Sequence, residues 1–132
     1  MAGYARLHQE FVRLKHGWQR PDATYEHQGA WLNTDHALLV TARAPDDGLV
    51  AAAFWIIYGH GAYYASGPSL QPNAQKAVLW QSLRLLRARG LHLAEFGRVD
   101  GETEKERNIA HFKCGWGGTT VPFLFATRKE SP

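Results

Sequence analysis

The feature that most constrains the fold is the apolar stretch at residues 49–58 (LVAAAFWIIY), which lies between two turn sequences. Residues 45–48 (PDDG) precede it, residues 59–61 (GHG) follow it, and shorter strand-like segments lie beyond the turns at 37–43 and 62–66. Strands joined by tight turns form an antiparallel meander. Because the middle strand is apolar almost throughout, both of its faces must be covered. The sequence therefore predicts a meander with packing layers on both sides.

Three segments have the apolar spacing or the end signals of helices. Residues 4–14 carry one apolar stripe, and a second helix is predicted to begin at residues 21–22 (PD). A third helix is expected at residues 72–89, because Gly90 suits the left-handed position that follows a helix. The predicted stripes are Tyr4, Leu7, Phe11 and Leu14 in the first helix and Leu79, Leu83 and Leu86 in the third.

The remaining elements are predicted in the last third of the chain. Residues 91–96 have the composition of a strand. Thr103 and Glu106 have the spacing of a capping box, which predicts a helix at residues 104–113. A final strand is expected at residues 121–127, where a proline near its start suits an edge position.

The order of elements is then helix, helix, three antiparallel strands, helix, strand, helix, strand. A strand–helix–strand crossover places two parallel strands in the same sheet. The predicted fold class is therefore α+β, or mixed α/β, with a central mixed sheet in which an antiparallel meander is followed by a β-α-β crossover and helices cover both faces. At 132 residues the chain is expected to form one domain, residues 1–132.

Composition narrows the class of protein further. The longest apolar run is too short to span a bilayer, and Met1 is not followed by a signal-peptide pattern. A single cysteine, Cys114, excludes an internal disulfide and fits a reducing cytoplasm. The seven histidines do not have metal-ligand spacing, so no metal site is expected. A net charge of +3 is compatible with an anionic substrate and is weak support for nucleic-acid binding.

Charged side chains follow the fourth predicted strand. On an extended chain Arg98 and Asp100 point the same way and Glu95 the opposite way, unless Gly97 interrupts the alternation. The carboxyl ends of strands are where open sheets commonly bind ligands. An ion pair of Arg98 with Glu95 or Asp100 that only fixes the loop would explain the same charges equally well.

Two further groups are candidate site residues. Lys113 precedes the Gly117-Gly118 pair, and a lysine with free backbone amides can neutralise a phosphate or an oxyanion. The alternative is a lysine and glycines that only complete a helix end. Tyr63 and Tyr64 alternate across a strand, so one of them can present a hydroxyl as an acid or a substrate contact, although most such tyrosines are packing residues.

An ordered set of motifs extends along most of the chain, roughly from Tyr4 to Val121. Its members are Tyr58-Gly59, Tyr63-Tyr64, Ser66-Gly67, Leu79-Trp80, Arg89-Gly90, Glu95-Phe96-Gly97-Arg98, Asn108, Phe112-Lys113 and Trp116-Gly117-Gly118. This set resembles the acyltransferase lobe of the FemAB-like proteins, which belong to the wider GNAT acyltransferase superfamily. The Phe-Lys-x-x-aromatic-Gly-Gly ending is its most specific piece, and the strand with an acidic residue before it is the next.

The resemblance implies a GNAT-type fold, in which the mixed sheet splays open near the strand end and admits an acyl donor. Family members transfer an acyl or aminoacyl group to an amine. The implied co-substrate is acyl-CoA or aminoacyl-tRNA, with no tightly bound cofactor, and the implied acceptor is a small-molecule or peptidoglycan-precursor amine. The chain departs from the family in two respects, because it has room for one lobe where FemAB-like enzymes usually have two, and it lacks the glycine-rich pyrophosphate loop of members that use acetyl-CoA.

The predicted function is therefore N-acyl transfer by a single GNAT-like, FemAB-type domain. The candidate catalytic residues are Lys113, Glu95, Asp100 and Tyr64, and the candidate substrate-binding residues are Arg98, Tyr63, Asn108, Gly117 and Gly118. Lys113 matches the family lysine that stabilises charge near the transferred carbonyl or the phosphates of the substrate. Glu95 or Asp100 would orient the amine or accept its proton.

Two alternatives and one assembly prediction accompany this function. The chain could be a non-catalytic lobe that binds a ligand or partner, or an accessory protein that binds tRNA. A lone lobe would expose the apolar surface that its missing neighbour covered, and such patches tend to become interfaces. We therefore expect a homodimer, to which the N-terminal helix or the final strand contributes.

Overall fold

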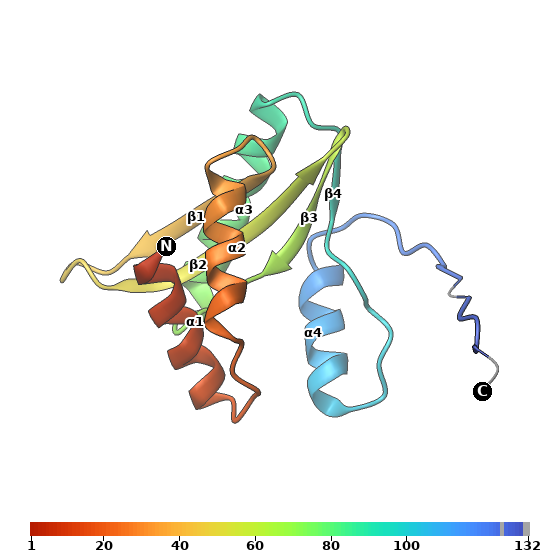
Figure 1. The fold of residues 1–132 in the computed structure, drawn as a ribbon, viewed down its shortest axis with the longest axis horizontal. Helices are drawn as coiled ribbons and strands as arrows, with labels where there is room; N and C mark the ends of the chain where they lie inside the picture. The colour runs from red at the N-terminus through yellow and green to blue at the C-terminus, as the bar shows by residue number, and fades with distance from the viewer. Residues whose placement is uncertain (125, 131–132) are drawn as a thin grey trace. The chain divides into compact units, whose positions relative to one another are not determined.

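The computed structural model describes residues 1–124 and 126–130 and divides the chain into two compact units, Met1–Gly97 and a second unit that begins at Arg98 (Figure 1). The first unit contains α1 (Ala2–Leu14), α2 (Asp22–Leu32), β1 (Ala37–Arg43), β2 (Leu49–Tyr58), β3 (Gly61–Ser66), α3 (Pro72–Ala88) and β4 (Leu93–Glu95). The second contains α4 (Glu104–Cys114). Within the described part of the chain, no helix is long and apolar enough to cross a membrane.

The sheet of the first unit has the strand order β1-β2-β3-β4. The first three strands pair antiparallel, and β3 pairs parallel with β4 after the crossover through α3. This arrangement confirms the predicted fold class of a meander followed by a β-α-β unit. The fourth strand is shorter than expected, because only Leu93–Glu95 pair with β3, in a register that sets Glu95 beside Tyr63.

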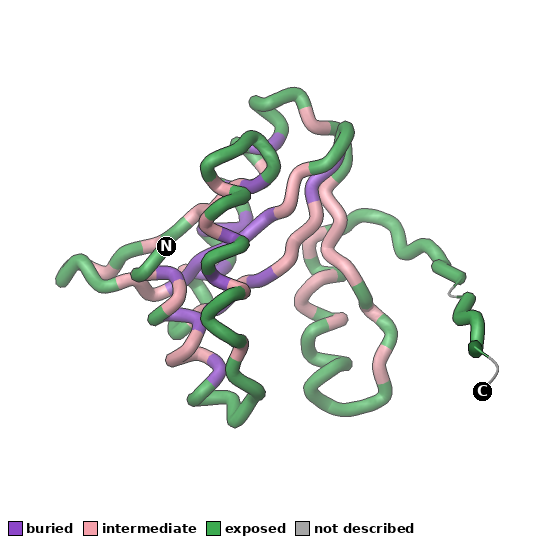
Figure 2. Tube along the Cα trace, viewed as in Figure 1, coloured by how far each residue is buried: buried purple, intermediate pink, exposed green. Residues whose placement is uncertain are grey.

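The core lies on the two faces of β2, whose residues 51–55 have no exposed surface (Figure 2). Phe54 packs with Tyr4 of α1 and Tyr25 of α2, so these two helices cover one face. Helix α3 covers the opposite face, where Tyr64 pairs with Trp55 (Figure 1). The apolar run at residues 49–58 is thus covered on both sides, as its composition predicts.

The stripe of α3 is largely as predicted, and the helix packs against β2. Leu79 and Leu86 are buried, whereas Leu83 is half-buried. The helix covers the face of β2 that carries Trp55, whereas Phe54 and Ile56 belong to the cluster under α1 and α2. Because neighbouring strand residues point to opposite faces, a helix pattern alone does not determine which face the helix covers.

The buried stripe of α1 is rotated relative to the prediction. Leu14 is 53% exposed, whereas Val12 and His8 are buried. The reason is a polar contact that apolar spacing does not reveal, because His8 Nδ1 lies 2.9 Å from the Tyr25 hydroxyl of α2. The pair turns His8 inward and Leu14 outward.

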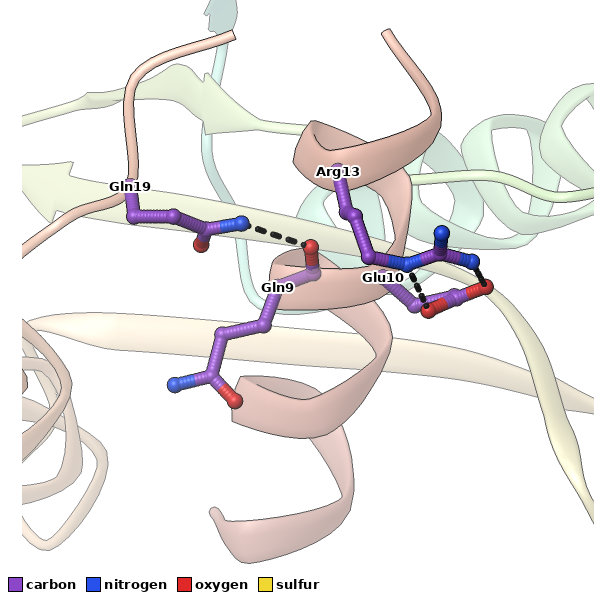
Figure 3. Close-up of polar contacts among 4 residues, drawn as sticks. All are labelled: Gln9, Glu10, Arg13 and Gln19. Carbon is purple, nitrogen blue, oxygen red and sulfur yellow. Dashed lines mark hydrogen bonds and ion pairs between the residues drawn. The ribbon is translucent and has the colours of Figure 1, made fainter. Parts of the chain in front are cut away.

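The outer face of α1 is polar, and the segment that connects α1 to α2 forms a hydrogen bond with this helix. Arg13 makes a two-pronged ion pair with Glu10, in which its Nη2 lies 2.6 Å from Oε1 and its Nε 2.9 Å from Oε2 (Figure 3). The Gln19 side chain donates a hydrogen bond of 3.0 Å to the Gln9 carbonyl (Figure 3). This bond ties the segment between the two helices back onto α1.

In the second unit the predicted capping box starts α4. The Glu106 amide donates to the Thr103 hydroxyl over 3.1 Å, and that hydroxyl lies 2.9 Å from Glu106 Oε1. The final strand predicted at residues 121–127 is not formed by residues 121–124 or 126–127, and Phe125 lies outside the described residues. A strand needs a partner for its backbone groups, and Pro122 has no amide to donate. The exposed fractions of Val121, Phe123 and Leu124 are 56%, 68% and 99%.

Candidate functional site

Glu95 ends the edge strand β4 and is held by a residue from two strands away. The Tyr58 hydroxyl, at the end of β2, donates a hydrogen bond of 2.7 Å to Glu95 Oε2. The sheet register explains this reach, because Ile56 lies beside Tyr63 and Tyr63 beside Glu95. Tyr58, two residues beyond Ile56, therefore shares their face. The sequence motifs include Tyr58 but assign it no role, since nothing local links residues 37 positions apart.

These three side chains, Tyr58, Tyr63 and Glu95, form what we call the Glu95 patch. Tyr58 is 50% exposed, and Tyr63 and Glu95 are half-buried. The hydrogen bond to Glu95 raises the pKa of Tyr58, and partial burial and the charge of Glu95 add to this effect. Tyr58 therefore stays protonated at neutral pH and remains a donor to the carboxylate.

Tyr64 faces the other side of the sheet, toward α3. Its hydroxyl accepts a hydrogen bond of 2.7 Å from Gln75 Nε2, and burial raises the pKa of Tyr64 to about 12. The ring packs against Trp55 and Phe96, with ring centroids 5.2 Å and 5.7 Å away. The hydroxyl thus keeps its proton, while the amide of Gln75 occupies one of its acceptor positions.

The loop after β3 passes directly over this hydroxyl. A Cβ added at Gly67 would lie 1.4 Å from Tyr64 Oη and 2.7 Å from Gln75 Nε2, so only glycine fits there. Two polar atoms nearby, Trp55 Nε1 and Gln75 Oε1, are buried without a hydrogen-bond partner in the described structure. Unsatisfied buried polar atoms are costly, and functional sites are among the places that retain them.

In the second unit Arg98 and Asp100 form an exposed ion pair. Arg98 Nε lies 2.5 Å from Asp100 Oδ1, and the two side chains are 76% and 78% exposed. Their mutual hydrogen bond raises the pKa of Arg98 and lowers that of Asp100. The structure thus forms the Arg98–Asp100 pair that the sequence left as one alternative, while Glu95 bonds to Tyr58 instead.

Lys113 lies next to the backbone of the same loop. Its Nζ donates a hydrogen bond of 3.0 Å to the Arg98 carbonyl, and burial lowers the pKa of Lys113. Lys113 therefore links the last turn of α4 to the residues before the helix. The structure brings Lys113 and Arg98 together through the backbone of Arg98, not through its guanidinium.

The other predicted residues of this unit lie at or beyond α4. Asn108 is exposed on the helix. Gly117 and Gly118 both have a positive φ of 81°, which favours glycine. The Gly117 amide, which we expected to stabilise substrate charge, donates instead to the Cys114 carbonyl over 3.1 Å and so completes the helix end.

A hollow of about 400 Å³ lies at the start of α4. Its lining residues are Arg98, Asp100, Gly101, Glu102, Thr103 and Glu106. Three of them are acidic, and the one cation in the lining, Arg98, is paired with Asp100. Among the residues that the structure describes, no group of three or more His, Cys, Asp or Glu side chains is placed to hold a metal ion.

The sequence matches no protein-family model, and a search of curated protein sequences finds no match either. Solved structures do match. A structure described as a probable acetyltransferase has a TM-score of 0.69 and 11% identity, over 98% of this chain and 91% of that one. A putative acetyl transferase from Pyrococcus furiosus has a TM-score of 0.64 and 12% identity, over 95% and 91% of the two chains.

A third match is the structure of AAC(6')-Iy in complex with the bisubstrate analogue CoA-S-monomethyl-acetylneamine. It has a TM-score of 0.68 and 15% identity, over 98% of this chain and 91% of that one. At such identities the likeness shows the fold alone. This chain therefore has the GNAT-like fold of these structures. None of these three structures is described as FemAB-like, so the matches neither support nor contradict the resemblance to a FemAB-like lobe.

Proposed function

We propose that this chain is an N-acyltransferase, a single domain of residues 1–132 that transfers an acyl group from acyl-CoA to an amine. The observation that carries the proposal is the likeness in fold to acetyltransferases over 98% of the chain. One of those structures was solved with an analogue that joins CoA to an amine substrate. Acyl transfer to an amine is the chemistry that the fold and the motifs support together.

The loop between β3 and α3 supports the choice of acyl-CoA as donor. No side chain caps the first turn of α3, so its amides are available to an anion. A helix N-terminus that follows a glycine-containing loop suits phosphate groups. The donor would then lie beside Gly67, although the longer glycine-rich loop is missing from the sequence.

The reaction needs a proton donor on the side of the sheet where the thioester lies. The amine nitrogen attacks the thioester carbonyl and forms the C–N bond, the C–S bond breaks, the nitrogen loses a proton to water, and the departing thiolate takes one up. Tyr64, neutral and already accepting from Gln75, is the proposed proton donor to the thiolate. Glu95 lies on the opposite face of the sheet from Tyr64, so its predicted role toward the amine is an alternative to this arrangement.

The sequence also predicted a more specific donor, acceptor and set of residue roles, and these remain alternatives within the proposal. An aminoacyl-tRNA donor with a peptidoglycan-precursor acceptor, in the manner of a FemAB-like lobe, rests on the motifs at residues 95–118. The charge-stabilising role of Lys113 and the anchoring roles of Arg98 and Asn108 remain predictions. So do a cytoplasmic location and a homodimer.

The experiment that tests the proposal incubates the purified chain with acetyl-CoA and a panel of amines and measures thiol release together with product mass. Amine-dependent release is expected, and Tyr64→Phe should reduce kcat, by about 10²–10⁴-fold if general acid catalysis is rate-limiting. Aminoacyl-tRNA is offered in parallel, and product from that donor alone would favour the FemAB-like alternative. If neither donor is consumed with any amine, the enzyme proposal is wrong and the non-catalytic alternative gains support.

A further inference from the structure

Acidic side chains are missing from the middle of the chain. Residues 48–94 contain no aspartate or glutamate, although the whole chain has 12. The same segment contains Lys76, Arg84, Arg87 and Arg89, which lie on α3 or directly after it. The net charge of +3 therefore conceals a separation of charge along the sequence, because the acids that nearly balance these cations belong to other segments.

Three of these cations share the outer face of α3 with a tryptophan. Successive residues of an α-helix are about 100° apart around its axis, so an arc of about 80° holds Lys76, Trp80, Arg84 and Arg87. All four side chains are exposed, and the exposed fraction of Trp80 is 59%. We call these four residues the α3 stripe. The buried residues of α3 lie on the opposite side of the helix, which packs on β1 and β2.

The α3 stripe has no partner within the described part of the chain. None of its cations forms an ion pair there, and the Trp80 ring packs against no other described ring. The helix dipole accounts for Arg84 and Arg87, which lie near the negative end of α3. It does not account for Lys76, which lies toward the positive end. The folding of α3 therefore does not explain the whole stripe.

The length of the α3 stripe indicates a polyanion. Lys76 and Arg87 are separated by about 16 Å along the helix axis, which is too far for one small anion to contact both. A nucleic-acid backbone supplies regularly spaced negative charges over such a length. No acidic side chain within residues 48–94 offsets the attraction.

The tryptophan selects among polyanions. Trp80 lies between Lys76 and Arg84 on the stripe, and its exposed indole offers a flat apolar face on which an unpaired base stacks. Cations that follow the backbone, together with an aromatic ring for the bases, are the combination by which proteins hold single strands. A lipid surface suits the stripe less well, because the apolar side of α3 faces the sheet and is not available for insertion.

We propose that the α3 stripe binds single-stranded nucleic acid, with Lys76, Arg84 and Arg87 on phosphates and Trp80 stacked on a base. RNA and DNA share this chemistry, so both are offered in the test. The surface goes beyond the proposed function, because its binding needs neither an acyl donor nor an amine.

The binding test uses fluorescence anisotropy of labelled strands about 12 nucleotides long. The strands are oligo(U), oligo(dT) and an abasic strand that has the phosphodiester backbone without bases. The purified chain is expected to bind oligo(U) or oligo(dT) about tenfold more tightly than the abasic strand. The tighter of the two identifies the preferred sugar. The logarithm of the binding constant should fall with the logarithm of salt concentration with a slope of about −2, as expected for three phosphate contacts on a single strand.

Two substitutions on exposed positions separate stacking from charge. Trp80→Ala should weaken the binding of the base-containing strands about tenfold and leave the salt slope unchanged. Arg84→Gln should make the slope shallower by about 0.7 for all three strands. The matched controls are Trp18→Ala and Arg6→Gln, because Trp18 is 77% exposed before α2 and Arg6 is exposed on α1. Both controls should leave affinity and slope unchanged.

Three results would overturn the proposal. They are failure of both base-containing strands to bind at low salt, equal affinity for these strands and the abasic strand, and the same response to Trp80→Ala and Trp18→Ala. Cosedimentation with phosphatidylglycerol vesicles in place of oligonucleotide binding would assign the stripe to an anionic lipid surface instead. These outcomes are independent of acyl transfer, which is measured separately with acetyl-CoA and amines.

Discussion

The buried histidine of α1 gives a stability that depends on pH. His8 is 5% exposed, and burial, with a smaller contribution from the charge of Arg20, lowers the pKa of His8 from 6.5 to about 4. The unfolded chain therefore binds a proton between about pH 6.5 and pH 4 that the folded chain does not. The stabilisation that neutral His8 allows is complete above pH 6.5 and is lost as the pH falls toward 4.

The size of this effect follows from the two pKa values. A difference of one pKa unit corresponds to about 1.4 kcal/mol, so His8 accounts for at most about 3.5 kcal/mol of stability. For a domain that is stable by about 5–15 kcal/mol, this is a large fraction. The free energy of unfolding should fall by about 2–3 kcal/mol from this group between about pH 7 and about pH 4.5.

The assay is urea unfolding followed by tryptophan fluorescence at about pH 7 and about pH 4.5, in the wild type and in His8→Asn. Asparagine places a polar atom near the position of Nδ1, within reach of the Tyr25 hydroxyl, and it does not titrate. Carboxylates such as Asp100 lose stabilising effects in both proteins, so the difference between the proteins isolates His8. A pH-dependent loss that is the same in the two proteins would refute the reasoning.

Three further predictions follow from burial and contacts. Leu79→Ala should lower the free energy of unfolding, measured by urea titration, by about 2–5 kcal/mol, because Leu79 has no exposed surface. Leu83→Ala should lower it clearly less, because Leu83 is half-buried. Equal losses in the two variants would contradict the packing of α3. Lys113→Ala should cost no more than about 1 kcal/mol, since the side chain is a helix-end cation with one hydrogen bond, and a larger cost would make its role structural. Light scattering at micromolar concentration should give a homodimer, because Val121, Phe123 and Leu124 expose apolar side chains, and a monomer mass would exclude it.

Several features of the fold were readable in short stretches of sequence. The apolar run at residues 49–58 with its turns predicted a meander, and the chain forms it with residues 51–55 fully buried. Gly90 has the predicted positive φ, at 83°. Thr103 and Glu106 form the predicted cap of α4. Such features are local, because turns, caps and periodicity involve residues within a few positions of one another.

Other features depended on partners that the sequence does not name. The stripe of α1 turned toward His8 because Tyr25 of another helix lies there. The face of β2 that α3 covers was undetermined by the spacing of Leu79 and Leu86, since either face of an apolar strand accepts a helix. The segment at residues 121–127 has the composition of a strand, but composition supplies no neighbouring edge for its backbone.

The candidate site also combines residues that the sequence identified with contacts that only the folded chain makes. The sequence by itself identified Glu95 as a charge at the end of a strand and the two tyrosines of β3 as alternating. Only the tertiary structure brought Tyr58 to Glu95, because the register of three strands sets that contact, and only the position of α3 gave Tyr64 its partner Gln75. Periodicity fixes the elements within a segment, whereas the pairing of segments is decided by the free energy of packing them together.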